Sequence, residues 1–132
     1  MRFVQLLLAV LVFFPALLVA ELPPSAYEAM QAKASDYVRI EVLRVDVEPG
    51  ENPAQQKILM VALVTEVIRS ASNLQPSDIV NISYTVTEHP AGWAGPGAVP
   101  ILTEKQTTVA YLNKEESGDF APAAGRMTFE NF

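Results

Sequence analysis

The chain has 132 residues, half of them hydrophobic, and its fifteen Asp and Glu against nine Lys and Arg give a net charge of −6. It contains no cysteine and a single histidine, His89. This excludes disulfides, thiolate metal sites, a cysteine nucleophile and any site that needs two histidines of one chain. The negative charge repels phosphate backbones, so we expect no nucleic acid among its partners.

Residues 1–20 have the layout of a secretory signal peptide. Arg2 precedes an apolar run, Leu6–Val19, and the small residue Ala20 closes it before Glu21. We expect cleavage after Ala20, and export to a periplasm or to the outside of the cell. The alternative is an uncleaved N-terminal membrane anchor, because the apolar segment reaches the lower limit of a membrane-spanning helix.

The remaining residues, 21–132, are predicted to form a single domain, because a chain of 112 residues suffices for one hydrophobic core. Arg2 is the only charged residue among the first twenty, so the net charge of this domain is −7. That charge disfavours contact with anionic membrane surfaces once the first segment is removed. Without disulfides, packing alone must hold the domain together.

A short helix followed by a long strand opens the domain. The predicted helix is Ser25–Ala34, with its first residue and Glu28 at the spacing of a capping box. In the following strand, Tyr37–Val47, the apolar positions change parity between Val42 and Leu43. One extra residue in the ladder explains such a change, so we predict a β-bulge there. Three helix residues are expected to pack on the domain: Tyr27, Met30 and Ala34.

Two further strands are predicted before a long irregular segment. Lys57–Ile68 is the most apolar part of the domain, and we predict a central strand covered on both faces. Ile79–Thr87 alternates regularly between apolar and polar residues. Its predicted inward positions are Val80, Ile82, Tyr84 and Val86.

Residues 88–100 (the 88–100 loop) are not expected to form a regular element, because three prolines and three glycines interrupt them. Two short strands, Ile101–Leu102 and Thr107–Leu112, are predicted to follow. The acidic tail from Asn113 is predicted to be solvated and rich in loops, with a last short strand allowed at Arg126–Phe129.

These elements predict an all-β domain, a small OB-like barrel of about five to six strands with a short N-terminal helix. Their order resembles the netrin-like branch of OB-fold barrels, which the tissue inhibitors of metalloproteinases also use. Those inhibitors depend on a cysteine at the mature N-terminus and on disulfides, both absent here. The resemblance therefore implies a fold and transfers no inhibitory function and no functional residue. The segments that carry it are Tyr27–Met30, Ala34–Val38, Val67–Ser70, Leu74–Val80, Pro100–Leu102 and Val109–Leu112.

The 88–100 loop holds the candidate binding residues, which are Trp93, His89 and Glu88. Trp93 is flanked by glycines and offers a flat aromatic surface on a connecting segment, where binding residues are common. The alternative is that Trp93 folds back and closes one end of the barrel. His89 beside Glu88 suggests an acid–base pair or a pH sensor, against the alternative of an ordinary surface histidine. No catalytic residue, cofactor or metal ligand is predicted.

The preferred function is that of a non-catalytic binding or accessory protein of the cell envelope or extracellular space. Its partner, a protein or another envelope component, would contact the 88–100 loop. The alternative is a small carboxylate-dependent hydrolase or sugar-processing enzyme that uses Glu66, Asp78 and Glu88, which requires two carboxyl groups facing each other across a cleft. A third alternative, a structural subunit paired by a strand to a larger assembly, requires an uncovered sheet edge.

Overall fold

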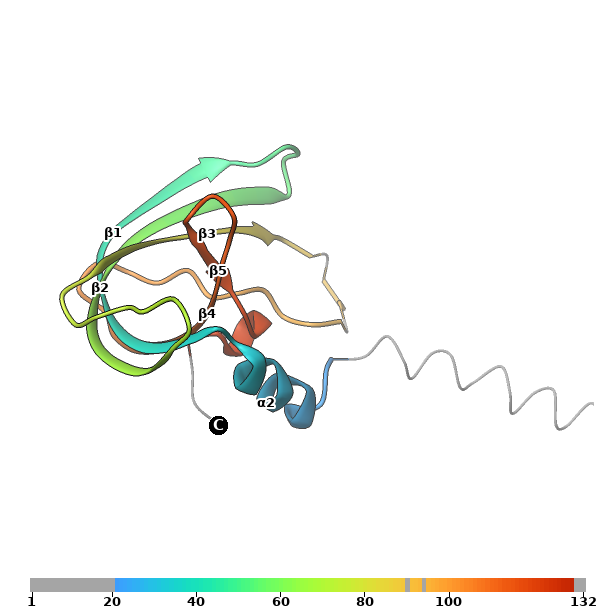
Figure 1. Cartoon of the computed structure of the whole chain (residues 1–132). Helices are drawn as coiled ribbons and strands as arrows, with labels where there is room; N and C mark the ends of the chain where they lie inside the picture. The colour runs from blue at the N-terminus through green and yellow to red at the C-terminus, as the bar shows by residue number, and fades with distance from the viewer. Residues whose placement is uncertain (1–20, 90, 94, 130–132) are drawn as a thin grey trace, which may run out of the picture.

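The computed structural model describes residues 21–89, 91–93 and 95–129. The predicted signal peptide, residues 1–20, lies outside the described residues. In the described part of the chain no helix is long and apolar enough to cross a membrane. The fold is mostly β, as predicted (Figure 1). Its elements are α2 (Pro24–Lys33), β1 (Asp36–Pro49), β2 (Gln55–Ser70), β3 (Ile79–Thr87), β4 (Thr107–Lys114), β5 (Phe120–Pro122) and the 3₁₀-helix η2 (Gly125–Met127).

The five strands close into a barrel in the order β1-β2-β3-β5-β4. β1, β2 and β3 are consecutive antiparallel neighbours, and β4 pairs antiparallel with the first half of β1. β5 is short, parallel to β3 and antiparallel to β4, and it closes the barrel. This mixed five-stranded barrel is consistent with an OB-like fold. The predicted class, a β-barrel with a short N-terminal helix, is confirmed.

Alternate residues of the strands fill the barrel with side chains. Ile40 of β1, Met60 of β2, Ile82 of β3 and Leu112 of β4 are each 0% exposed and belong to one cluster. In β3, Val80 and Ile82 are buried, while Tyr84 and Val86 are partly buried. The predicted inward positions are therefore confirmed for Val80, Ile82 and Tyr84, which belong to the core or pack against it, whereas Val86 is partly buried as its neighbour Thr87 is.

The predicted β-bulge is at Leu43. Val42 lies opposite Ala62 and Arg44 lies opposite Val61, so Leu43 has no residue opposite it in β2. The extra residue lets Val42 and the partly buried Val45 both pack against the core although three positions separate them. A bulge bends a strand and increases its twist, as closure of a small barrel requires.

β2 is covered on one face only, contrary to the prediction. Its even-numbered residues from Ile58 to Val64 are buried, whereas the intervening Leu59 is 37% exposed. A sheet that closes on itself has an inner face that forms the core and an outer face that meets solvent. The apolar run of β2 therefore reflects the β-branched and aliphatic composition of the strand, and it does not indicate burial on both sides.

The ends of the domain also depart from the sequence expectations. α2 begins at Pro24 with Pro23 as N-cap, and Ser25 makes no capping hydrogen bond because it lies inside the helix. Ile101–Leu102 forms no strand. Tyr27 and Ala34 are buried and Met30 is partly buried against the domain, as predicted.

The C-terminal tail is not solvated throughout. Residues 113–118 are exposed, but Phe120 and Phe129 are 4% and 3% exposed and join the barrel core. The segment at Arg126–Phe129 includes a 3₁₀-helix in place of a strand. Three large apolar side chains of the tail are therefore buried, those of Phe120, Met127 and Phe129.

Candidate functional site

The 88–100 loop is tied to the barrel at both ends. The Glu88 N–H donates to the carbonyl of Ala54 at 2.8 Å, and the Tyr84 hydroxyl donates to the carbonyl of Pro100 at 2.7 Å. Burial raises the pKa of Tyr84 to about 12, so its hydroxyl remains a donor at any physiological pH. The loop therefore leaves and rejoins the domain at fixed points.

Trp93 lies outside the barrel core and is 52% exposed. The His89 ring stacks on it, with centroids 4.2 Å apart and planes 10° from parallel. The indole Nε1 donates to the carbonyl of Pro96 at 3.2 Å. A Cβ at Gly95 would lie 2.3 Å from Trp93 Cζ2, so glycine alone permits this close approach. Three neighbours thus fix the indole ring while about half of it faces solvent.

Of the three predicted binding residues, the structure brings two together. His89 and Trp93 form the stacked pair, and Glu88 is exposed where the loop begins. In the described part of the chain, no hydrogen bond or ion pair joins Glu88 to His89. The geometry therefore provides an aromatic platform and no acid–base pair.

Glu21, which the sequence analysis did not single out, makes three contacts that converge on one carboxylate. Oε1 accepts from the Tyr27 hydroxyl and from Arg126 Nε at 3.0 Å, and Oε2 accepts from the Gly97 N–H at 3.0 Å. The Arg126 guanidinium also lies 4.9 Å from the centre of the Tyr27 ring. The hydrogen bonds from Tyr27 and Arg126 hold the pKa of Glu21 below its usual range. The partners lie 6, 76 and 105 positions away, so no local pattern reveals the site.

Asp36, also missed, is 0% exposed at the start of β1. Its carboxylate accepts from the hydroxyls of Ser35, Ser70 and Ser72 at 2.6, 2.5 and 2.8 Å, and from the Ser72 N–H at 3.2 Å. Burial alone would raise the pKa of Asp36, but these hydrogen bonds outweigh it and the pKa is lowered. With its oxygens occupied in this way, Asp36 joins the ends of β1 and β2 and is not available for chemistry.

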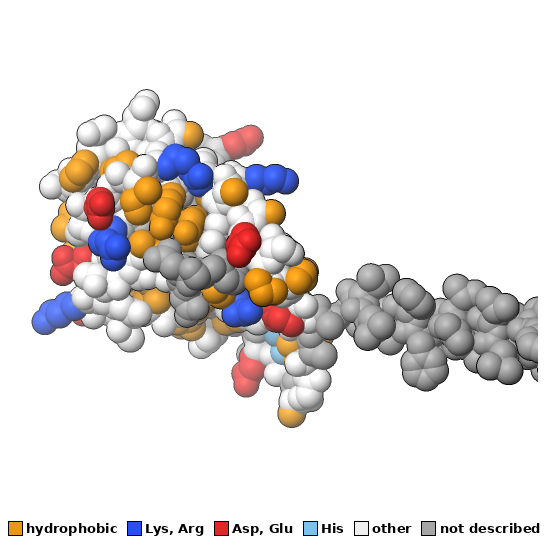
Figure 2. Space-filling view, turned by 90° about the horizontal axis from the view of Figure 1, so that it is seen from below, with side chains coloured by type: hydrophobic (Ala, Val, Ile, Leu, Met, Phe, Trp, Pro, Cys, Tyr) orange, Lys and Arg blue, Asp and Glu red, His pale blue; other side chains and the backbone are white. Residues whose placement is uncertain are grey.

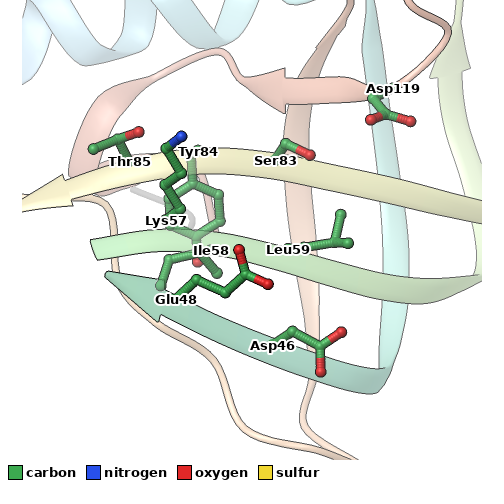
Figure 3. A pocket seen from close by; sticks show the side chains of 9 residues that line it. All are labelled: Asp46, Glu48, Lys57, Ile58, Leu59, Ser83, Tyr84, Thr85 and Asp119. Carbon is green, nitrogen blue, oxygen red and sulfur yellow. The ribbon is translucent and has the colours of Figure 1, made fainter. Parts of the chain in front are cut away.

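A depression of about 470 Å³ lies on the barrel wall formed by β1, β2 and β3 (Figure 3). The carboxylates of Asp46 and Glu48 come from β1, while Asp119, which precedes β5, lies across the strands on the opposite side. Lys57 of β2 lies beside Tyr84 and Thr85. The other lining residues are Ile58, Leu59, Ser83, Tyr84 and Thr85.

The carboxylates proposed for an alternative enzyme are not brought together at this depression. Glu66 Oε2 lies 3.5 Å from Arg39 Nε in an exposed ion pair, and Asp78 Oδ2 accepts from the Gln75 N–H at 2.8 Å within a turn. Glu88 lies at the start of the loop. Within residues 21–89, 91–93 and 95–129, no group of three His, Asp or Glu side chains could hold a metal ion.

Exposed apolar side chains are distributed over the domain. Figure 2 shows one face on which hydrophobic side chains gather, with charged side chains of both signs around them. Isolated exposed apolar residues are normal on protein surfaces. Trp93 differs from the others in size and in being fixed by its neighbours. Among the described residues the large exposed ones are Leu22, Leu43, Val47, Leu59, Ile68, Ile79, Trp93 and Ile101.

No protein-family model, no curated protein and no solved structure matches the chain. A function can therefore be proposed only from its own residues and their geometry.

Proposed function

We propose that this chain is a non-catalytic binding module that contacts a protein or another envelope component through the 88–100 loop. The observation that carries the proposal is Trp93, half exposed yet fixed by His89, Gly95 and the Pro96 carbonyl. Burial of an aromatic side chain is favourable, so an exposed and immobilised one favours contact with a partner. Because the ring is already ordered, the entropic cost of ordering it on binding is small.

The place of action belongs to the same proposal. Export is supported by the layout of residues 1–20. Assignment of the barrel to the netrin-like branch of OB folds is supported by the strand order together with the sequence resemblance. The net charge of −7 after cleavage supports a partner other than nucleic acid or an anionic membrane.

The test is retention of a partner from the secreted or periplasmic fraction by the tagged exported protein. We expect Trp93→Ala to weaken retention at least about tenfold, since interface hot spots of this type cost about 2 kcal/mol or more when truncated. The matched control is Ile79→Ala, because Ile79 is 60% exposed on the barrel and lies outside the loop. The proposal fails if Trp93→Ala retains every partner, or if both variants lose the same partner equally.

A carboxylate-dependent hydrolase is the second candidate, now at a different place from that expected. It is favoured by the position of Asp46 and Asp119 on opposite sides of the depression (Figure 3). Hydrolysis of glycoside or ester substrates that is lost in Asp46→Asn and Asp119→Asn, but kept in Glu66→Gln, would favour this candidate over a binding module.

A further inference from the structure

We infer that Glu21 is a positioning residue for the 88–100 loop: its carboxylate fixes where the loop, and with it Trp93, lies against the barrel. The effect on partner binding rests on the proposed function, whereas the positioning itself can be tested without any partner. Two sets of contacts carry the inference, one on each oxygen of the carboxylate.

The first set connects Glu21 to the indole ring. Oε2 accepts the Gly97 N–H at 3.0 Å, and the residue before Gly97 is Pro96, whose carbonyl accepts Trp93 Nε1 at 3.2 Å. Among loop residues 91–93 and 95–99, the one hydrogen bond to a residue outside the loop is that of Gly97 to Glu21. The hydrogen bonding of these loop residues to the rest of the domain therefore depends on this one carboxylate oxygen, while Val99 packs against the core near the end of the loop.

The second set connects Glu21 to the rigid part of the domain. Oε1 accepts from the hydroxyl of Tyr27, which lies in α2 and is 1% exposed, and from Arg126 of η2. Arg126 also approaches the loop, because a Cβ added to Gly97 would lie 3.1 Å from its Cδ. Glu21 thus links α2, η2 and the loop, three segments that are far apart in the sequence.

A carboxylate is the side chain that suits this position. It accepts hydrogen bonds from three donors, one of them the charged guanidinium of Arg126, and charge-assisted hydrogen bonds are stronger than neutral ones. A glutamine at this position would keep one acceptor oxygen, enough for some of these hydrogen bonds, and would lose the ion pair with Arg126. An alanine would release both the loop and the Tyr27–Arg126 pair from the N-terminal segment.

Trp93 is the only tryptophan in the chain, so its fluorescence reports on the loop alone. We expect Glu21→Ala to increase acrylamide quenching of Trp93 and to accelerate exchange of the Gly97 amide hydrogen at least about tenfold. Glu21→Gln should give an intermediate result. The control, Glu28→Gln, changes an exposed residue of α2 and should leave both measurements unchanged. A thermal unfolding curve shows whether each variant remains folded.

The outcomes separate this inference from the proposed function. Equal quenching and equal Gly97 exchange in Glu21→Ala and the natural protein would overturn the positioning role, even if Trp93→Ala loses a partner. A released loop in Glu21→Ala, with every partner retained by Trp93→Ala, would confirm the positioning role and overturn the binding proposal. If the positioning role and the binding proposal are both correct, Glu21→Ala should weaken partner retention although His89 and Trp93 are unchanged.

Discussion

Asp36 is a charged side chain without exposed surface, and its four hydrogen-bond donors explain how the domain tolerates it. An ionised carboxylate transferred into a protein interior loses its hydration, a cost that only strong hydrogen bonds or an opposite charge can offset. The serine hydroxyls at Ser35, Ser70 and Ser72 supply those bonds. They come from two chain segments, one that leads into β1 and one at the end of β2, so the carboxylate also holds together the place where β1 begins and β2 ends.

Stability should therefore fall in acid. The pKa of Asp36 is lowered in the folded domain, so the unfolded chain takes up the proton first as the pH decreases. The stabilisation from this group is present above the unfolded pKa of about 4 and is lost as the pH falls through the folded value. Urea unfolding between pH 7 and pH 3 measures this loss. Asp36→Asn should be less stable at pH 7 by about 1–3 kcal/mol and should show a smaller loss below pH 4.

Glu66→Gln is the matched control for Asp36→Asn. Its carboxylate forms an exposed ion pair with Arg39, and exposed pairs contribute little to stability. An equal acid sensitivity in Asp36→Asn and the natural protein would show that other carboxylates cause the loss. Glu21 has a lowered pKa and so contributes in the same direction, which the Glu21→Gln variant separates.

At the scale of the elements, the bulge in β1 predicts that the domain still folds when Leu43 is deleted. Leu43 is the residue without an opposite position in β2, so its removal leaves the inward or outward direction of every other residue in β1 unchanged. We expect the Leu43 deletion to fold cooperatively, with some loss of stability because the bend is lost. Circular dichroism and urea unfolding measure this.

Deletion of Glu41 is the control for the Leu43 deletion. Glu41 lies opposite Leu63 in the regular ladder, so its loss shifts one part of β1 by one residue and turns buried side chains outward. This variant should fail to fold. If both deletions behave alike, the bulge does not act as a removable insertion.

Local patterns predicted β3 and the bulge because the side-chain period of a strand is two residues, and both features depend only on neighbours in the sequence. The same patterns predicted exposure of the C-terminal tail wrongly, because Phe120 and Phe129 follow an acidic run and are buried by strands far away in the sequence. The loop could be recognised from its glycines and prolines. Its link to Glu21 could not, since 76 residues separate Glu21 from Gly97.

At the scale of the whole molecule, the second half of β1 has an uncovered edge in the described part of the chain. β4 pairs with β1 only from Asp36 to Glu41, whereas β2 pairs with β1 as far as Pro49. Figure 1 shows the end of β1 extending beyond the closed part of the barrel. The Gly50 N–H donates to the carbonyl of Gln55 in β2. Because successive residues of a strand direct their N–H and C=O groups to opposite sides, those of Val45 and Val47 point away from β2. Such an edge is a template for pairing with another chain.

Two acidic side chains and a proline protect this edge. Asp46 and Glu48 are exposed, and Pro49 has no N–H to donate. The double variant Asp46→Asn/Glu48→Gln should therefore associate with itself, and its weight-average mass in sedimentation velocity should rise with concentration. The control is Glu115→Gln/Glu116→Gln, which makes the same change of net charge in an exposed turn beyond β4.

Adding Val45→Pro to the edge variant removes an N–H that points away from β2 and should restore the monomer, because pairing through the strand edge needs that donor. Association of both double variants would instead show that reduced net charge, and not the uncovered edge, causes it.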